Sequence, residues 1–167
     1  MPEMPTPAED LTIVRIRRPD HDLLATLEGY DREAFGATGL RTYDLAVMAQ
    51  AGGVFEARVG EESVGGCQLF RTLDEPDFCY LVGFYLRPDW QGRGLGRAFL
   101  LALAEEVRRM GTGGMLLTVA PENVRALSLY RSVGFVDEAF VPDFYGDGHD
   151  RYILRWRFGQ EGLQGSV

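Results

Sequence analysis

The chain has 167 residues, a length that suits one domain with a real core. Apolar residues make up 46% and the formal net charge is −8, which argues against a broad nucleic-acid surface and is compatible with a cationic substrate such as an amine. No apolar run is long enough to span a membrane, and the N-terminal residues lack the pattern of a signal peptide. We therefore expect a cytoplasmic protein that binds neither nucleic acid nor membrane.

The N-terminal third predicts one strand and two helices. Residues 1–10, rich in proline and acids, are expected to form a flexible leader, and 11–17 alternate apolar and polar residues as a half-buried strand does. Helical patterns follow over about 21–28 and 41–51. The glycine-punctuated segment 29–36 between them is expected to be irregular and to shape a substrate pocket.

The middle of the chain predicts an antiparallel meander followed by a helix. Strand-like runs cover about 54–59, 63–72 and 78–86, and their short connections suit hairpins. The apolar period then changes to that of a helix over about 95–110. Its apolar stripe consists of Leu95, Phe99, Leu103, Val107 and Met110.

The last third predicts a short buried strand over 115–119 and a second amphipathic helix that ends at Gly134. A strand begins after that glycine, and a loop over 140–149 leads to a final strand over about 150–158. Residues 159–167 are expected to be a flexible tail. The elements therefore describe a single α/β domain.

Two cysteines occur, Cys67 and Cys79, and neither lies in a pattern typical of metal or redox sites. A hairpin of the two flanking strands would place Cys67 opposite a residue near Gly83, not opposite Cys79. We therefore predict two free core thiols and no metal.

A glycine-rich loop, residues 91–98, joins a predicted strand to a predicted helix. Closely spaced glycines let backbone N–H groups face a bound anion, and the helix N-terminus adds partial positive charge. Arg93 and Arg97 supply cationic side chains, so a pyrophosphate is the natural ligand. The P-loop pattern needs a lysine, which the chain lacks, and the dinucleotide pattern needs glycine where Arg97 stands. The pattern [QR]-x-x-G-x-[GA] is met by Gln91, Gly94 and Gly96.

This loop resembles the signature of the GNAT superfamily of N-acetyltransferases, which binds the pyrophosphate of acetyl-CoA. A second block, residues 123–135, resembles the family pattern N-x-x-A-x-x-L-Y-x-x-x-G-F. The resemblance covers about 11–158, which we take as the domain, and is tight over 80–135. It implies an α/β (α+β) fold: a mixed, mostly antiparallel twisted sheet flanked by helices and splayed at its central strand.

The resemblance also assigns cofactor contacts, with acetyl-CoA as co-substrate. They come from the central strand, the glycine loop and the second block: Phe84, Tyr85, Leu86, Gln91, Gly92, Arg93, Gly94, Leu95, Gly96, Arg97, Asn123 and Tyr130. Asn123 also suits the N-cap of the second helix. Tyr130 is implied to be the general acid that protonates the departing sulfur, whereas a lone tyrosine here would be taken as core packing with Leu127 and Phe135.

The general base is less well marked. Family members that acetylate N-termini of ribosomal proteins carry a glutamate where this chain has Thr118, so their base and substrate do not transfer directly. Glu33 is the preferred base and a substrate contact, and Tyr85, Asp143 and His149 are alternatives. Thr118 and Tyr145 are the further expected substrate contacts, Tyr145 because its loop resembles the family's penultimate hairpin.

The function expected from these features is direct transfer of an acetyl group from acetyl-CoA to a primary amine. The partner is a small-molecule amine, an amino acid or a peptide N-terminus, and the protein is expected to be a monomer or homodimer. The alternative is a non-catalytic acyl-CoA-binding sensor, which would not need the hydroxyl of Tyr130.

Overall fold

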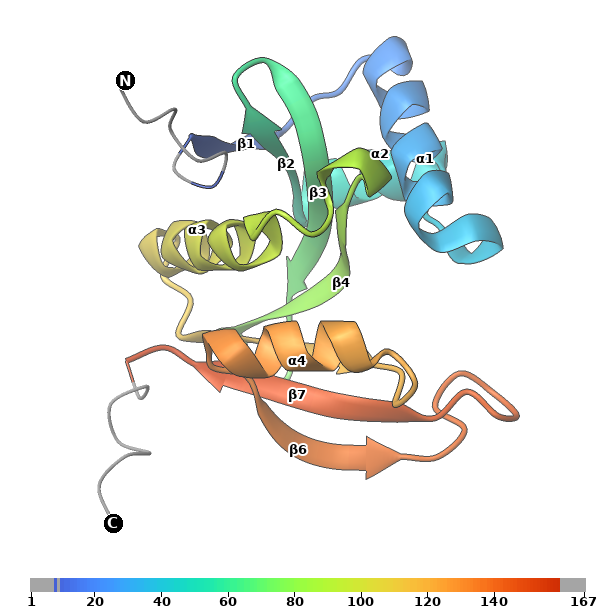
Figure 1. The fold of residues 1–167 in the computed structure, drawn as a ribbon, viewed down its shortest axis with the longest axis vertical. Helices are drawn as coiled ribbons and strands as arrows, with labels where there is room; N and C mark the ends of the chain where they lie inside the picture. Colours follow the sequence, from blue (N-terminus) through green and yellow to red (C-terminus); the bar gives the residue numbers. More distant parts are fainter. Residues whose placement is uncertain (1–7, 9, 160–167) are drawn as a thin grey trace. The chain divides into compact units, whose positions relative to one another are not determined.

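The computed structural model describes residues 8 and 10–159, so the predicted leader and tail lie almost entirely outside the described residues. The described residues form seven strands and four α-helices (Figure 1). They are β1 (Leu11–Ile16), α1 (His21–Phe35), α2 (Thr42–Ala51), β2 (Gly53–Val59), β3 (Glu62–Arg71), β4 (Phe78–Leu86), α3 (Leu95–Arg109), β5 (Gly114–Val119), α4 (Val124–Val133), β6 (Val136–Val141) and β7 (Arg151–Arg157). Short 3₁₀ turns occupy Gly36–Thr38 and Pro88–Trp90.

The strands form one mixed sheet in the order β1-β2-β3-β4-β5-β7-β6. The pairs β1/β2, β2/β3, β5/β7 and β6/β7 are antiparallel, whereas β4 and β5 are parallel. The parallel register runs from Phe78–Gly114 to Tyr80–Leu116, and β4 continues to Leu86 beyond the last of these pairs. The predicted fold class, a mostly antiparallel sheet flanked by helices, is confirmed.

Residue contacts divide the chain into two compact units. The first unit comprises the residues up to Phe70 together with Leu81–Leu103, and the second comprises Arg71–Tyr80 together with the residues from Ala104 onwards. Strand β4 and helix α3 each contribute residues to both units. Each unit has to satisfy the charges and polar groups that it buries.

Helix α1 packs its apolar face into the core of the first unit. Asp20 caps the helix by accepting a hydrogen bond from the Leu23 amide at 2.8 Å. The buried core here consists of Ile16, Leu27, Leu45, Ala49 and Val54. Leu23, Leu24 and Tyr30 of α1 pack against that core, so the helix is held by side chains spaced one turn apart.

The prediction of an irregular segment over 29–36 is wrong, because α1 continues to Phe35. Gly29 lies on the exposed side, where a helix tolerates it at a modest cost in stability. The helix ends at Gly36, whose φ of 60° suits a residue without a Cβ. Glu33 is therefore a helical residue near the C-terminus of α1.

The apolar stripe of α3 is confirmed for four of its five residues. Leu95, Phe99, Leu103 and Val107 are fully buried, whereas Met110 lies one residue past the end of the helix and is 37% exposed. The cysteines match their prediction, since Cys67 and Cys79 are both free and buried.

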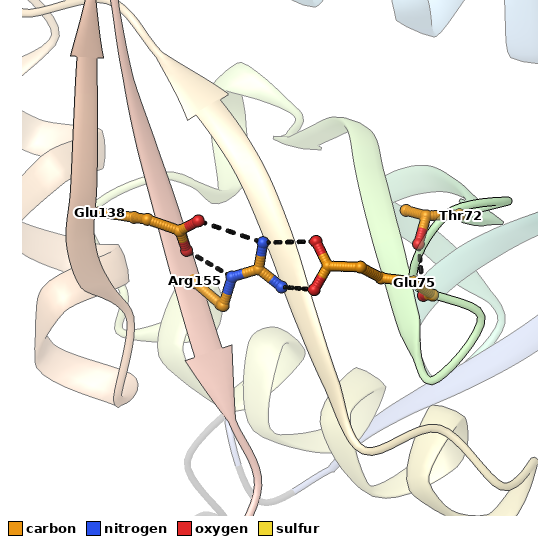
Figure 2. Close-up of polar contacts among 4 residues, drawn as sticks. All are labelled: Thr72, Glu75, Glu138 and Arg155. Carbon is orange, nitrogen blue, oxygen red and sulfur yellow. Dashed lines mark hydrogen bonds and ion pairs between the residues drawn. The ribbon is translucent and has the colours of Figure 1, made fainter.

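An almost buried arginine organises the second unit. Arg155 of β7, whose side chain is 6% exposed, makes a two-pronged ion pair with Glu75 at 2.7 and 2.9 Å. On its other side it donates two hydrogen bonds to Glu138 of β6 (Figure 2). Its guanidinium also lies 4.6 Å from the ring centre of Phe78, the first residue of β4. One cation thereby joins β6 and β7 to the turn before β4.

We expect Arg155→Met to lower the free energy of unfolding by about 1–3 kcal/mol, because it leaves two carboxylates without their shared partner. Hydrogen bonding to Arg155 lowers the pKa of Glu138. The stabilisation is therefore present above the unfolded-state pKa of about 4.3 and is lost as pH falls through the lowered folded-state pKa. The difference between wild type and variant should shrink below about pH 4 in denaturant titrations.

The matched control is Arg109→Met, which removes an exposed arginine paired with Glu106 at 3.4 Å. Such a surface pair contributes about 0–1 kcal/mol. If both variants lose the same stability at neutral pH, Arg155 does not hold the second unit as described.

Candidate active site

The first unit contains the part of β4 that is expected to contact the cofactor. The ring of Phe84 packs on Phe99 with centroids 4.7 Å apart, and Tyr85, 6% exposed, meets Phe35 edge to face at 5.9 Å. Burial raises the pKa of Tyr85 far above its usual range. Its hydroxyl therefore stays protonated at neutral pH, which removes Tyr85 from the candidate bases.

The glycine loop connects β4 to α3 in the same unit. Gln91 anchors its start by donating from Nε2 to the Leu86 carbonyl at 3.0 Å. Gly92 and Gly94 adopt φ values of 74° and 76°, a region that L side chains rarely enter. The fully buried Leu95 then begins α3. The loop is thus held at both ends, with Gly92 and Gly94 exposed and Gly96 buried in the first turn of α3.

The electrostatics of this loop favour an anion. It precedes a 15-residue helix whose first turn carries no acidic residue. Arg93 and Arg97 are both exposed on the loop and first turn, and the guanidinium of Arg93 lies 4.8 Å from the ring centre of Trp90. Exposed backbone amides, a helix N-terminus and two cations together form a site suited to phosphate.

The second unit contains a chain of three hydroxyl groups. Thr118 of β5 lies 3.1 Å from the hydroxyl of Tyr80 and 3.2 Å from that of Tyr145. Burial raises the pKa of Tyr80 to about 12, so this hydroxyl is uncharged at neutral pH. Arg151 lies over the Tyr145 ring at 5.0 Å. The predicted substrate residues Thr118 and Tyr145 are thus direct neighbours.

Helix α4, also in the second unit, carries Asn123 and Tyr130. Asn123 is the N-cap, and its side-chain oxygen accepts from the Ala126 amide at 3.2 Å. The half-buried Tyr130 ring meets Phe135 at 5.5 Å, and Phe135 in turn packs on Trp156 at 5.5 Å. The ring of Tyr130 therefore packs on Phe135, as the alternative considered from the sequence expected. The role of its hydroxyl as general acid stays a prediction.

The candidate bases occupy different surroundings. The Glu33 carboxylate lies 3.8 Å from Arg87, whose guanidinium stacks over Tyr30 at 4.2 Å. Asp143 accepts a hydrogen bond from the Gly148 amide at 2.7 Å and so stabilises the turn between β6 and β7, which also contains His149. The role of Glu33 as the base stays a prediction, and the structure adds an arginine partner that the sequence did not reveal.

Tyr80, the third member of the hydroxyl chain, is not among the residues predicted from the sequence. Its contact with Thr118 depends on the parallel pairing of β4 and β5, which joins residues 38 positions apart. The hairpin pattern before β4 gave no signal for that pairing. The available clue was that two tyrosines, Tyr80 and Tyr85, lie in a strand whose other residues are apolar.

Comparison with known proteins agrees with this geometry. Residues 14–135 match the family model for the acetyltransferase (GNAT) family, and the chain belongs to that family. It is 41% identical over 108 residues to the L-amino acid N-acyltransferase MnaT of Escherichia coli K12, covering 65% of this chain and 59% of that protein. The [ribosomal protein bS18]-alanine N-acetyltransferase of the same strain is 34% identical over 85 residues, 50% of this chain and 55% of that protein.

A solved structure shows the same fold. The yncA protein of Salmonella typhimurium, solved with its cofactor acetyl-CoA, has a TM-score of 0.70 and 21% identity and covers 91% of this chain and 96% of that one. The chain spans about half the length of the curated relatives that it matches. Within residues 8 and 10–159, no group of three or more His, Cys, Asp or Glu side chains is arranged to hold a metal ion. None of the described helices has the length and apolarity of a membrane span.

Proposed function

We propose that the protein is an acetyl-CoA-dependent N-acetyltransferase that acts on a primary amine: a small cationic amine, an amino acid or a peptide N-terminus. The observation that carries this proposal is the exposed glycine loop at the start of α3, in a chain that belongs to the acetyltransferase (GNAT) family. The names of two relatives support the acceptor class, because one acylates L-amino acids and the other acetylates an alanine of a ribosomal protein.

The proposed cofactor site uses the loop for phosphate and β4 for the pantetheine arm. The backbone of Gln91–Arg97 and the side chains of Arg93 and Arg97 bind the pyrophosphate. Backbone groups of Phe84, Tyr85 and Leu86 contact the arm, as the family resemblance implies. Asn123 contributes a further contact while capping α4. The geometry of the first unit supports the loop and strand assignments, and the Asn123 contact is what the family resemblance implies.

The reaction sets three requirements. The amine must lose its proton before it attacks, because an alkyl amine is mostly protonated at pH 7. Attack on the thioester forms the new C–N bond and a tetrahedral oxyanion, which backbone N–H groups of β4 can stabilise. Collapse breaks the C–S bond and expels a thiolate that benefits from protonation. We propose Glu33 as the base and Tyr130 as the proton donor to sulfur.

Thr118 and Tyr145 are proposed as acceptor contacts. With Tyr80 they form a chain of hydroxyl groups that can hydrogen-bond a substrate, and the threonine hydroxyl cannot act as a general base at neutral pH. Because this chain has Thr118 where some family members have a glutamate, its general base has to be a different residue.

Gly94→Val should weaken acetyl-CoA binding by at least about tenfold, because a β-branched residue strains a φ of 76° and crowds the phosphate amides. Isothermal titration calorimetry measures the change. Gly60→Val is the matched control: Gly60 has a similar φ of 62° in the turn between β2 and β3. Unchanged affinity for Gly94→Val, or equal losses in both variants, would remove the loop from the cofactor site.

Direct transfer predicts intersecting initial-rate plots when acetyl-CoA is varied at several concentrations of an accepted amine. A panel of amines, amino acids and short peptides, followed by thiol release, identifies that amine. The two buried cysteines give no exposed nucleophile for a covalent route. Parallel plots, or an acetylated protein detected by mass spectrometry without acceptor, would contradict the direct mechanism.

Tyr130→Phe should lower kcat by about 10²–10⁴-fold with little change in the KM for acetyl-CoA, because it removes a positioned acid and keeps the ring that packs on Phe135. Tyr43→Phe, at a tyrosine that is 78% exposed, is the matched control and should leave turnover unchanged. A folded Tyr130→Phe protein with wild-type turnover would make Tyr130 a packing residue only.

A further inference from the structure

A buried hydrogen-bonded pair links α1 to β3 in the first unit. Asp31, only 1% exposed, accepts from the Leu40 amide through Oδ1 at 2.8 Å and from Gln68 Nε2 through Oδ2 at 2.9 Å. An ionised carboxylate can only accept hydrogen bonds, so the atom of Gln68 that faces it has to be the amide nitrogen. Asp31 therefore determines which end of the Gln68 amide points away from it.

The end that points away is an acceptor without a donor. Gln68 is 2% exposed, and its Oε1 is buried with no hydrogen-bond partner among the residues that the structure describes. Leaving such an atom unsatisfied costs about 1–3 kcal/mol, and buried polar atoms in native proteins are rarely left so. Gln68 Oε1 is therefore an acceptor of fixed orientation that a hydrogen-bond donor of a ligand could satisfy.

The unpartnered oxygen lies against Gly83 of β4. A Cβ at Gly83 would lie 2.5 Å from Gln68 Oε1 and 3.5 Å from the ring of Phe35. Alternate residues of a strand share a face, so Gln68 and Gly66 of β3 lie together, as do Gly83 and Tyr85 of β4. The Tyr85 hydroxyl lies 2.6 Å from where a Cβ of Gly66 would be. Two buried polar groups thus occupy the space that a side chain at Gly83 or Gly66 would take.

The charge around these two polar groups favours a cation or an N–H donor. Both hydrogen-bond donors to Asp31 are neutral amides, so they do not balance its charge. Burial raises the pKa of the Asp31 carboxyl, which shows that its charge is costly where it lies. A positively charged nitrogen nearby would offset that cost.

We propose that Gln68, oriented by Asp31 with its oxygen toward Gly83, is a recognition site for an N–H group of the amine acceptor. The proposal rests on the acetyltransferase function proposed above and concerns the first unit alone. Gly83 directly precedes Phe84, the first residue of β4 assigned to the cofactor. Gln68 is then a specificity-determining residue, and Asp31 is a positioning residue that acts through it.

Asp31→Asn tests the orientation. The substituted side chain keeps one oxygen that can accept from the Leu40 amide, but its NH₂ group then faces Gln68, whose amide has to turn and offer its oxygen. Gln68 would then present its Nε2 donor toward Gly83 in place of its Oε1 acceptor. We expect the KM for the accepted amine to rise about tenfold or more, while the KM for acetyl-CoA changes less than twofold.

Gln68→Met provides a second variant that does not depend on the turn of an amide. Methionine keeps much of the volume of glutamine and removes the acceptor, so the KM for the amine should again rise about tenfold. Gly29→Ala is the control, because it alters α1 on its exposed side, where an added Cβ meets nothing within 4 Å. Circular dichroism and thermal unfolding establish that each variant is folded.

The outcomes separate this inference from the function on which it rests. If wild type acetylates an amine and folded Gln68→Met keeps its amine KM within twofold, the recognition site is wrong while the acetyltransferase function stands. If the KM values for amine and acetyl-CoA rise together, the pair supports β4 instead of the acceptor, and the proposal is also wrong. If wild type acetylates no amine in the panel, the proposed function fails and this inference fails with it.

Discussion

The second unit depends on balancing one nearly buried positive charge. A guanidinium that is 6% exposed has to find anions for its donors, and Arg155 finds them in Glu75 and Glu138. Its contact with Phe78 ties the first residue of β4 to β7, which lies on the other side of β5 in the sheet. Two residues further on, Tyr80 reaches Thr118. The ion pairs thus set the start of the strand whose third residue completes the hydroxyl chain.

The first unit buries a negative charge, that of Asp31, and the contacts that satisfy this charge leave another polar atom without a partner. Asp31 is less exposed than Arg155 and has neutral donors only, one from the backbone and one from Gln68. Satisfying Asp31 leaves Gln68 Oε1 unsatisfied. Proteins tend to break local rules of this kind where they bind ligands, and the cost is carried by the rest of the fold. Here the rest includes the tightly packed core below α1.

The sequence predicts much of this protein because its signals are local. Strand β4 has the predicted bounds, and the α3 stripe is right until Met110, where the helix has already ended. Helix α1 continues through Gly29, since a single glycine on an exposed helix face does not end a helix whose apolar residues keep packing. The glycine loop and the α4 block are marked by spacing alone. Tyr80 with Thr118 and Asp31 with Gln68 are pairs separated by 38 and 37 residues, so only the folded chain brings them together.

The hydroxyl chain of Tyr80, Thr118 and Tyr145 has a property that the Asp31–Gln68 pair lacks. Either oxygen in each of its contacts can be the donor, so the whole chain can reverse its direction without losing a hydrogen bond. In one direction Tyr145 accepts from Thr118, and in the other it donates to Thr118. Gln68 is held to a single polarity by a carboxylate that cannot donate. The first unit therefore holds a polar group with one fixed polarity, whereas the second unit holds a group whose polarity can reverse.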